Sequence, residues 1–194
     1  MASFADKPVH YFASADEWRD FLESDPHDDG VRLRLRKKTS NAPGITWQEA
    51  VDVALCYGWI DGQAGRLDDD YTLQAFTPRR KNSPWSVINQ GHVARLIEAG
   101  LMRPGGQAEI DRAKGDGRWD AAYRQKDAAP PPDLQAALDA SPAAAAKYAT
   151  LTKQNSFAII FRINGVKRPE TRARKIAEFV AMLERGETIY PQKG

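Results

Sequence analysis

The feature of this sequence that most constrains its fold is the strict alternation of apolar and basic residues from Val31 to Arg36. Successive side chains of a β-strand point to opposite faces, so the alternation predicts a half-buried strand over residues 31–37 with three arginines on its other face. Helical patterns precede and follow this strand. The chain is therefore predicted to belong to the α+β class.

Helix signals lie on both sides of the strand. Ser14 and Thr46 are each followed three residues later by a glutamate, which is the capping-box pattern, and apolar residues at helical spacing come next. Further along, Ser83 is a candidate N-cap, and Pro84 suits the first turn of a helix. These signals predict helices over residues 15–24, 47–57 and 84–99.

Two strand-like segments, residues 59–67 and 71–77, flank three consecutive aspartates and predict a β-hairpin. With the turn centred on Asp69, antiparallel pairing sets Asp61 near Thr77 and hence close to Arg79. The hairpin therefore predicts that a carboxylate and a guanidinium lie together at its open end.

From Pro104 onward the pattern is wholly helical. The triplet Pro130-Pro131-Pro132 is the best candidate for a linker, because proline extends the backbone and donates no hydrogen bond. The predicted organisation is an α+β domain with a small antiparallel sheet over residues 1–100, a helical connector with the proline-rich linker over 101–132, and a helical domain over 133–194. The helices predicted in this half are 105–115, 133–139, 142–152, 155–164 and 169–185.

Composition and motifs weigh against several functional classes. The 194 residues carry a formal charge of only +2, and no stretch is long and apolar enough to span a membrane. The amino-terminal segment does not resemble a secretory signal, so we expect a cytoplasmic protein. Cys56 is the only cysteine, the three histidines are scattered, and no hydrolase, P-loop or dehydrogenase motif is present, so we expect no metal and no cofactor.

The most unusual part of the sequence is the pair of segments that the hairpin brings together, residues 58–62 and 76–89. They combine two tryptophans, a carboxylate, a basic triplet and the start of a helix, a combination that favours the binding of an anion. The last helix carries Arg172 on its packed side, where a cation needs a partner and could reach the same anion. The candidate site residues are Trp59, Asp61, Arg79, Arg80, Trp85, Asn89 and Arg172.

Each of these residues also has a purely structural interpretation. Asp61 paired with Arg79 would pin the hairpin, the tryptophans would be core, Arg80 would be solvated, and Arg172 would snorkel to the surface or bind a carboxylate. Under the anion hypothesis, Arg79 and Arg80 bind the anion, the two tryptophans shape the pocket, and Asp61 orients Arg79.

Two other functions stay open at this point. An enzyme acting on a small anionic metabolite would use Asp61 as a general base, which a raised pKa of this carboxyl would favour and a tight pair with Arg79 would oppose. Nucleic-acid binding would use the basic helix over residues 169–185, because residues 151–194 carry nine Lys plus Arg against four Asp plus Glu. No nucleic-acid motif accompanies this helix, and such a run of charge is usually a solvated face.

Four long runs of the sequence are distinctive: ALCYGWIDGQ (54–63), FTPRRKNSPWSVIN (76–89), LIEAGLMRPGG (96–106), and PPDLQAAL through KRPETRARKIAEFVAMLERGE (131–187). In these runs, and over nearly its whole length, the chain resembles the bacterial YdeI/OmpD-associated family, also called bacteriocin-protection proteins. The resemblance implies that the helical part corresponds to the OmpD-associated domain and the amino-terminal part to an α+β unit. It also implies a role in tolerance of bacteriocins or antimicrobial peptides, and it brings no set of catalytic residues.

These features together predict a non-catalytic, cytoplasmic bacterial binding protein that acts in stress or antimicrobial tolerance. Its expected partner is a small anionic ligand or another protein, and neither nucleic acid nor a membrane is an expected partner. The family name suggests association with an outer-membrane porin, but we do not expect this for a chain with neither a secretory signal nor a disulfide.

Overall fold

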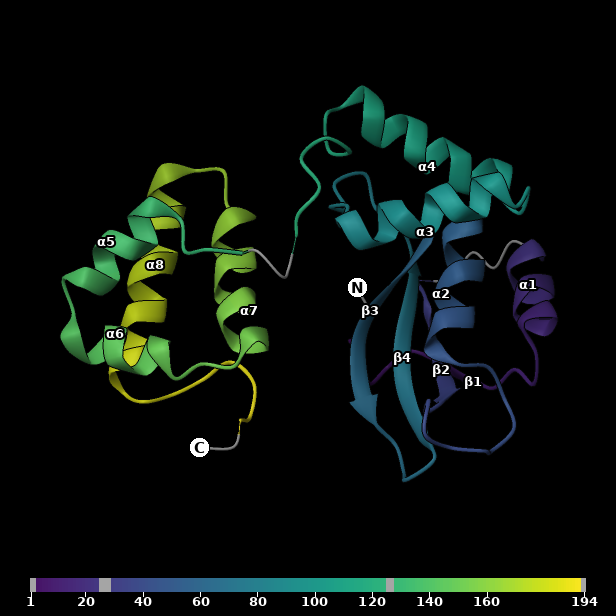
Figure 1. Ribbon diagram of the computed structural model, residues 1–194, viewed down its shortest axis with the longest axis horizontal. Coiled ribbons are helices and arrows are strands. Elements are labelled where there is room, and N and C mark those ends of the chain that lie inside the picture. Colours follow the sequence, from purple (N-terminus) through teal and green to yellow (C-terminus); the bar gives the residue numbers. More distant parts are fainter. Residues whose placement is uncertain (1–2, 25–28, 125–127, 193–194) are drawn as a thin grey trace. The chain divides into compact units, whose positions relative to one another are not determined.

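The computed structural model describes residues 3–24, 29–124 and 128–192 and divides the chain into two compact units, residues 1–123 and 124–194. The first unit combines a sheet with helices and the second is helical (Figure 1), so the α+β class and the predicted order of the two parts hold. Each unit has a hydrophobic core of its own. Residues 101–123, for which the sequence predicted a connector, lie in the first unit, and residues 125–127 of that connector lie outside the described residues.

The first unit contains a four-stranded sheet with the strand order β1-β2-β4-β3. Its strands are β1 (Val9–His10), β2 (Val31–Arg36), β3 (Trp59–Arg66) and β4 (Tyr71–Pro78). The sequence predicted an antiparallel sheet, but the sheet is mixed, because β1 pairs in parallel with β2. A two-residue strand is too short to produce an alternation in the sequence, and for this reason the prediction missed it.

The alternation in β2 has the predicted effect. The apolar side chains of this strand are at most 1% exposed and belong to the core, whereas its three arginines are half-buried on the other face of the sheet. There the guanidinium carbon of Arg34 lies over two aromatic rings, 4.7 Å from the centroid of Tyr11 and 4.0 Å from that of Tyr71. Aromatic side chains thus cover cationic ones on this face.

Four helices complete the first unit: α1 (Ala15–Glu23), α2 (Trp47–Cys56), α3 (Val87–Glu98) and α4 (Pro104–Gly115). In Figure 1, α2 lies along the sheet with α1 beside it, and α3 and α4 lie together at one end of the sheet. Ser14 and Thr46 cap α1 and α2 as predicted. Where α4 meets α2, Gly106 allows a close approach of backbones, because a Cβ at this position would lie 2.3 Å from the carbonyl oxygen of Cys56.

Helix α3 begins at Val87 and not, as predicted, at Pro84. Its N-cap is Ser86, whose hydroxyl accepts a hydrogen bond from the backbone N–H of Asn89 at 3.1 Å. The hydroxyl of Ser83 accepts instead from the backbone N–H of Arg80 at 2.9 Å and closes a turn. Residues 79–86 therefore form a loop between β4 and α3, which we call the Arg79 loop.

The hairpin of β3 and β4 turns around Asp69 as predicted, since Arg66 pairs with Thr72. Between Asp61 and Ala64 the register shifts, so that Asp61 pairs with Phe76 and not with Thr77. A β-bulge of this kind adds one residue to one strand. Asp61 consequently lies on the same face of the sheet as Phe76, which is fully buried.

The second unit consists of α5 (Pro132–Asp139), α6 (Pro142–Ala149), α7 (Lys153–Asn164) and α8 (Pro169–Glu184), each within about three residues of its predicted bounds. Apolar residues at helical spacing form its core, as the sequence predicted for α8 in particular. Among the described residues, no helix combines the length and the apolar character needed to cross a membrane.

Candidate anion-binding site

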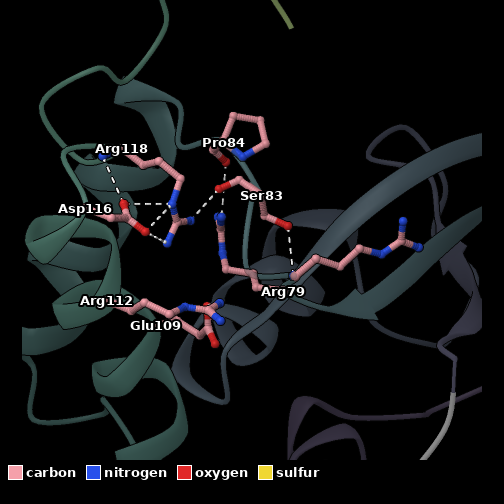
Figure 2. Close-up of polar contacts among 8 residues, drawn as sticks. Arg79, Ser83, Pro84, Glu109, Arg112, Asp116 and Arg118 are labelled. Atoms are coloured by element: carbon pink, nitrogen blue, oxygen red, sulfur yellow. Dashed lines mark hydrogen bonds and ion pairs between the residues drawn. The ribbon is translucent and has the colours of Figure 1, made fainter. Parts of the chain in front are cut away.

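The Arg79 loop buries Arg79, and the whole residue is only 6% exposed. The backbone N–H of Arg79 donates to the carbonyl of Gly58 at 2.9 Å and thereby ties the start of the loop to the hairpin. The side chain then turns toward the end of the loop, where Nη1 donates to the carbonyl of Pro84 at 3.2 Å (Figure 2). The guanidinium carbon lies 3.5 Å from the centroid of the Trp85 ring.

Arg79 and Trp85 together have three side-chain donors without an acceptor among the described residues. Nε and Nη2 of Arg79 and Nε1 of Trp85 are buried, and they hydrogen-bond to none of the described residues. Buried N–H groups without an acceptor are rare in proteins because each one loses its hydrogen bond to water without replacement. Free donors around a positive charge form a favourable environment for an anion.

The carboxylates nearest to Arg79 are engaged with other groups. Glu109 on α4 pairs with Arg112 of the same helix. Asp61 on β3 accepts a hydrogen bond from the indole Nε1 of Trp47 at 3.2 Å. Both carboxylates are close enough to influence Arg79 electrostatically, but among the described residues no carboxylate forms an ion pair with it.

A second arginine, Arg118, supports the loop from the segment after α4 (Figure 2). Its Nη1 donates to the carbonyl of Ser83 at 2.7 Å, and its Nε lies 2.8 Å from both carboxylate oxygens of Asp116. Arg112 and Arg118 thus each have a carboxylate of their own. Arg79 differs from both because no carboxylate of the described residues forms an ion pair with it.

Burial shifts the pKa values of both members of the predicted pair. It lowers the pKa of Arg79 to about 10, although the negative charges of Glu109 and Asp61 act to raise it. Arg79 therefore remains protonated at neutral pH. Burial raises the pKa of Asp61, against the opposing effects of the hydrogen bond from Trp47 and the charge of Arg79. Both shifts have burial as their largest cause, as expected for two side chains that are removed from water without a close ion pair between them.

The structure brings together three of the seven predicted site residues: Asp61, Arg79 and Trp85. Trp59 is a core residue that packs edge-on against Trp18, with ring centroids 6.0 Å apart. The side chain of Arg80 is exposed and makes no polar contact with the described residues. Asn89 is half-buried in the first turn of α3.

Arg172, the seventh predicted residue, belongs to the second unit and is fully engaged there. Its Nε and Nη2 donate to the two carboxylate oxygens of Asp133 at 2.5 and 2.9 Å, and its Nη1 donates to the carbonyl of Ile163 at 2.9 Å. Two other cations of α8, Arg174 and Lys175, lie 3.8 and 3.9 Å from Glu178. The basic helix is therefore partly neutralised by carboxylates of its own unit.

Sequence reasoning missed five residues around the site: Trp47, Glu109, Arg112, Arg118 and Tyr123. Tyr123 is tied to the loop through its backbone, since its N–H donates to the carbonyl of Trp85 at 3.0 Å and its carbonyl accepts from Val87 N–H at 3.1 Å. A signal was present in the sequence, because residues 103–123 combine arginines with aromatic residues. Because the segment was predicted to be a connector, these residues were not assigned to the site.

The second unit carries an open groove of about 570 Å³ between α5 and α8. Its walls are mostly apolar and include Ala137, Ala173 and Ile176, and the closed pair of Asp133 and Arg172 lies at its edge. The described residues contain no group of three or more His, Cys, Asp or Glu side chains that could hold a metal ion. The free cationic donors identified above lie in the first unit.

Comparison with known proteins finds two matching family models. Residues 10–109 match a family described as "Domain of unknown function (DUF8412)". Residues 127–186 match a family described as "Bacteriocin-protection, YdeI or OmpD-Associated", which confirms the resemblance seen in the sequence for the second unit. No curated protein and no solved structure matches the chain.

Proposed function

Because the chain belongs to the family described as a domain of unknown function (DUF8412) and carries a YdeI or OmpD-associated domain at its carboxyl end, we propose that it is a non-catalytic binding protein whose first unit holds a small anion at Arg79. Neither family description names a ligand. The proposal therefore depends on the chemistry of the Arg79 loop.

The observation that carries the proposal is that the buried guanidinium of Arg79 has two N–H groups without an acceptor and no ion pair among the described residues. A buried guanidinium without a counter-ion destabilises a fold, because the charge loses its hydration and gains no partner. Here the destabilisation persists at neutral pH, since Arg79 remains protonated. An anion bound to Nε and Nη2 would supply both the missing charge and the missing acceptors.

The test is native mass spectrometry of the gently purified full chain, in the wild type and in two variants. Arg79→Met keeps an apolar side chain against Trp85 and removes the unpaired N–H groups, so we expect it to fold at least as stably as the wild type. Lys81→Ala is the control, because Lys81 is an exposed cation of the same loop. We expect a discrete extra mass on the wild type and on Lys81→Ala, and its loss from Arg79→Met.

Two results would contradict the proposal. The same extra mass on a folded Arg79→Met variant would overturn the role of Arg79. A wild type without any extra mass, and whose thermal unfolding does not respond to added inorganic or organic anions at matched ionic strength, would overturn anion binding altogether. That result would favour a protein partner.

A second candidate function is supported by the state of Asp61. Its pKa is raised by burial and it has no ion pair with Arg79, which are the two properties that a general base beside a cationic binding group needs. If the protein is an enzyme, we expect the wild type to convert the co-purified molecule on prolonged incubation. The Asp61→Asn variant should bind the same molecule and leave it unchanged. NMR spectra of the small molecule measure the conversion. An unchanged molecule with the wild type would oppose catalysis.

For the cellular role, we propose tolerance of bacteriocins or a related envelope stress, exerted from the cytoplasm. The description of the second unit's family supports this proposal. In a bacterium that lacks the protein, we expect the wild-type gene to restore survival under bacteriocin challenge and the Arg79→Met gene, expressed at the same level, to fail. Equal rescue by both genes would separate the anion site from tolerance, and recovery of the protein outside the cytoplasmic fraction would contradict the localisation.

A further inference from the structure

The unpaired atoms of Arg79 are the two that form one edge of the guanidinium, Nε and Nη2. Two other arginines of this chain use the same edge to hold a carboxylate. Arg172 donates from Nε and Nη2 to Asp133, at 2.5 and 2.9 Å. Arg185 donates from the same atoms to Glu187, at 2.9 and 2.8 Å. Both pairs have the two-pronged geometry that matches a planar guanidinium to a planar carboxylate.

Arg79 presents this edge in a different environment. The side chains of Arg172 and Arg185 reach their carboxylates at the surface of the second unit, whereas Arg79 is 6% exposed. Its third nitrogen, Nη1, already donates to the Pro84 carbonyl. The free edge is therefore the part of this guanidinium that is left for a ligand.

The surroundings restrict the shape and the charge of that ligand. The guanidinium carbon lies 3.5 Å from the centroid of the Trp85 ring, so the indole limits the space on that side of the guanidinium and favours a flat ligand group over a tetrahedral one. The neighbouring cations, Arg112 and Arg118, are already neutralised by Glu109 and Asp116. Arg79 is thus the cation of this group that has no carboxylate partner among the described residues, which favours a ligand with a single negative charge.

We propose that the ligand of this site presents a planar carboxylate, bound side-on to Nε and Nη2 of Arg79. This assignment rests on the proposed function, that Arg79 binds an anion, and adds the chemical class of the ligand. A carboxylate supplies two coplanar acceptors and a single negative charge. A phosphate group is tetrahedral and brings more charge than the site compensates.

The experiment uses the ¹⁵N-labelled full chain and four sodium salts at matched ionic strength: acetate, benzoate, methanesulfonate and inorganic phosphate. Methanesulfonate is a tetrahedral monoanion and separates the effect of shape from that of charge. The readouts are the side-chain Nε–H resonance of Arg79, identified by its absence from Arg79→Lys, and tryptophan fluorescence. All five tryptophans lie in the first unit, so the fluorescence reports on that unit alone.

We expect at least one carboxylate to shift the Arg79 Nε–H resonance. We also expect it to bind about tenfold or more tightly than methanesulfonate or phosphate, because one additional hydrogen bond to a charged group increases affinity by about this factor. Arg79→Lys, which keeps the charge and lacks the planar fork, should lose this preference. Lys81→Ala, in which an exposed cation of the same loop is removed, should retain it.

The outcomes test separately whether the site binds an anion and whether that anion is a carboxylate. If phosphate or methanesulfonate binds as tightly as the carboxylates and shifts the same resonance, the carboxylate assignment falls and anion binding stands. If none of the four salts shifts the Arg79 resonance, both proposals fall. The comparison among salts uses wild-type protein, so it does not depend on how well Arg79→Lys folds.

Discussion

At the scale of single residues, Asp61 and Arg79 owe their unusual properties to removal from water. Burial disfavours the charged form of each side chain, and it therefore raises the pKa of the carboxyl and lowers that of the guanidinium. A close ion pair would have opposed both shifts. The two side chains lie near each other without such a pair, because Asp61 accepts from Trp47 and Arg79 donates to Pro84.

The raised pKa of Asp61 predicts a dependence of stability on pH. The folded state binds this proton more tightly than the unfolded chain does, so the contribution of Asp61 to the free energy of unfolding falls as pH rises from the ordinary carboxyl range, about pH 4, through the raised pKa. Asp61→Asn keeps an acceptor for the indole of Trp47 and removes this contribution.

Urea unfolding followed by tryptophan fluorescence between about pH 4 and pH 7 measures the difference. We expect the wild type to lose more stability than Asp61→Asn over this range. Carboxyls with lowered pKa values, such as Glu49 and Asp116, affect both proteins equally and cancel in the comparison. Identical pH profiles would show that Asp61 titrates normally.

At the scale of elements, the Arg79 loop depends on where α3 begins. Ser83 and Ser86 are both suitable N-caps by local sequence, and Pro84 favours the earlier start. The structure selects Ser86, because the backbone of Tyr123 pairs with residues on both sides of it. The later start releases the Pro84 carbonyl to accept from Arg79 and leaves the guanidinium buried in a loop.

The packing of α4 against α2 positions Glu109 and Arg112 beside the site, and it depends on Gly106. A Cβ at this position would lie 2.3 Å from the Cys56 carbonyl oxygen and 2.6 Å from that of Leu55. Both obstacles are backbone atoms, so we expect Gly106→Ala to lower the free energy of unfolding by about 1–3 kcal/mol or more.

The matched control for this prediction is Gly115→Ala, at the other end of α4, where a Cβ would meet nothing within 4 Å. Alanine favours the helix over glycine there, and we expect a gain of up to about 1 kcal/mol. Chemical denaturation monitored by tryptophan fluorescence checks both variants. Equal stability of the two variants would contradict the close approach of α4 to α2.

At the scale of the whole molecule, each of the two units buries its own core, and we expect them to unfold separately. Leu134 is fully buried in the core of the second unit. Leu134→Ala should destabilise that unit by about 2–5 kcal/mol, because it removes apolar contacts and leaves a cavity. Tryptophan fluorescence, which reports on the first unit, should give the same unfolding midpoint as in the wild type.

Circular dichroism follows the helices of both units and should show an added early transition in Leu134→Ala. A parallel shift of the fluorescence midpoint would mean that the units unfold cooperatively. Val93→Ala is the complementary variant, because Val93 is 1% exposed in the core of the first unit and should shift the fluorescence midpoint.

The sequence by itself determined the elements whose signals are local. The alternation in β2, the N-cap of α1, the capping box of α2, the turn at Asp69 and the helices of the second unit all follow from spacing within a few residues. It also singled out Arg79, Asp61 and Trp85, because tryptophans and charged residues are concentrated there.

Tertiary structure alone decided the features that depend on distant backbone. These are the parallel strand β1, the bulge that moves the pairing of Asp61 by one residue, and the start of α3 beside Tyr123. It also decided which arginines have carboxylates, since Arg172 meets Asp133 and Arg79 meets none among the described residues. The hydrogen-bond partners of a buried group are the residues that the fold places beside it, and the spacing of residues along the sequence does not predict which residues these are.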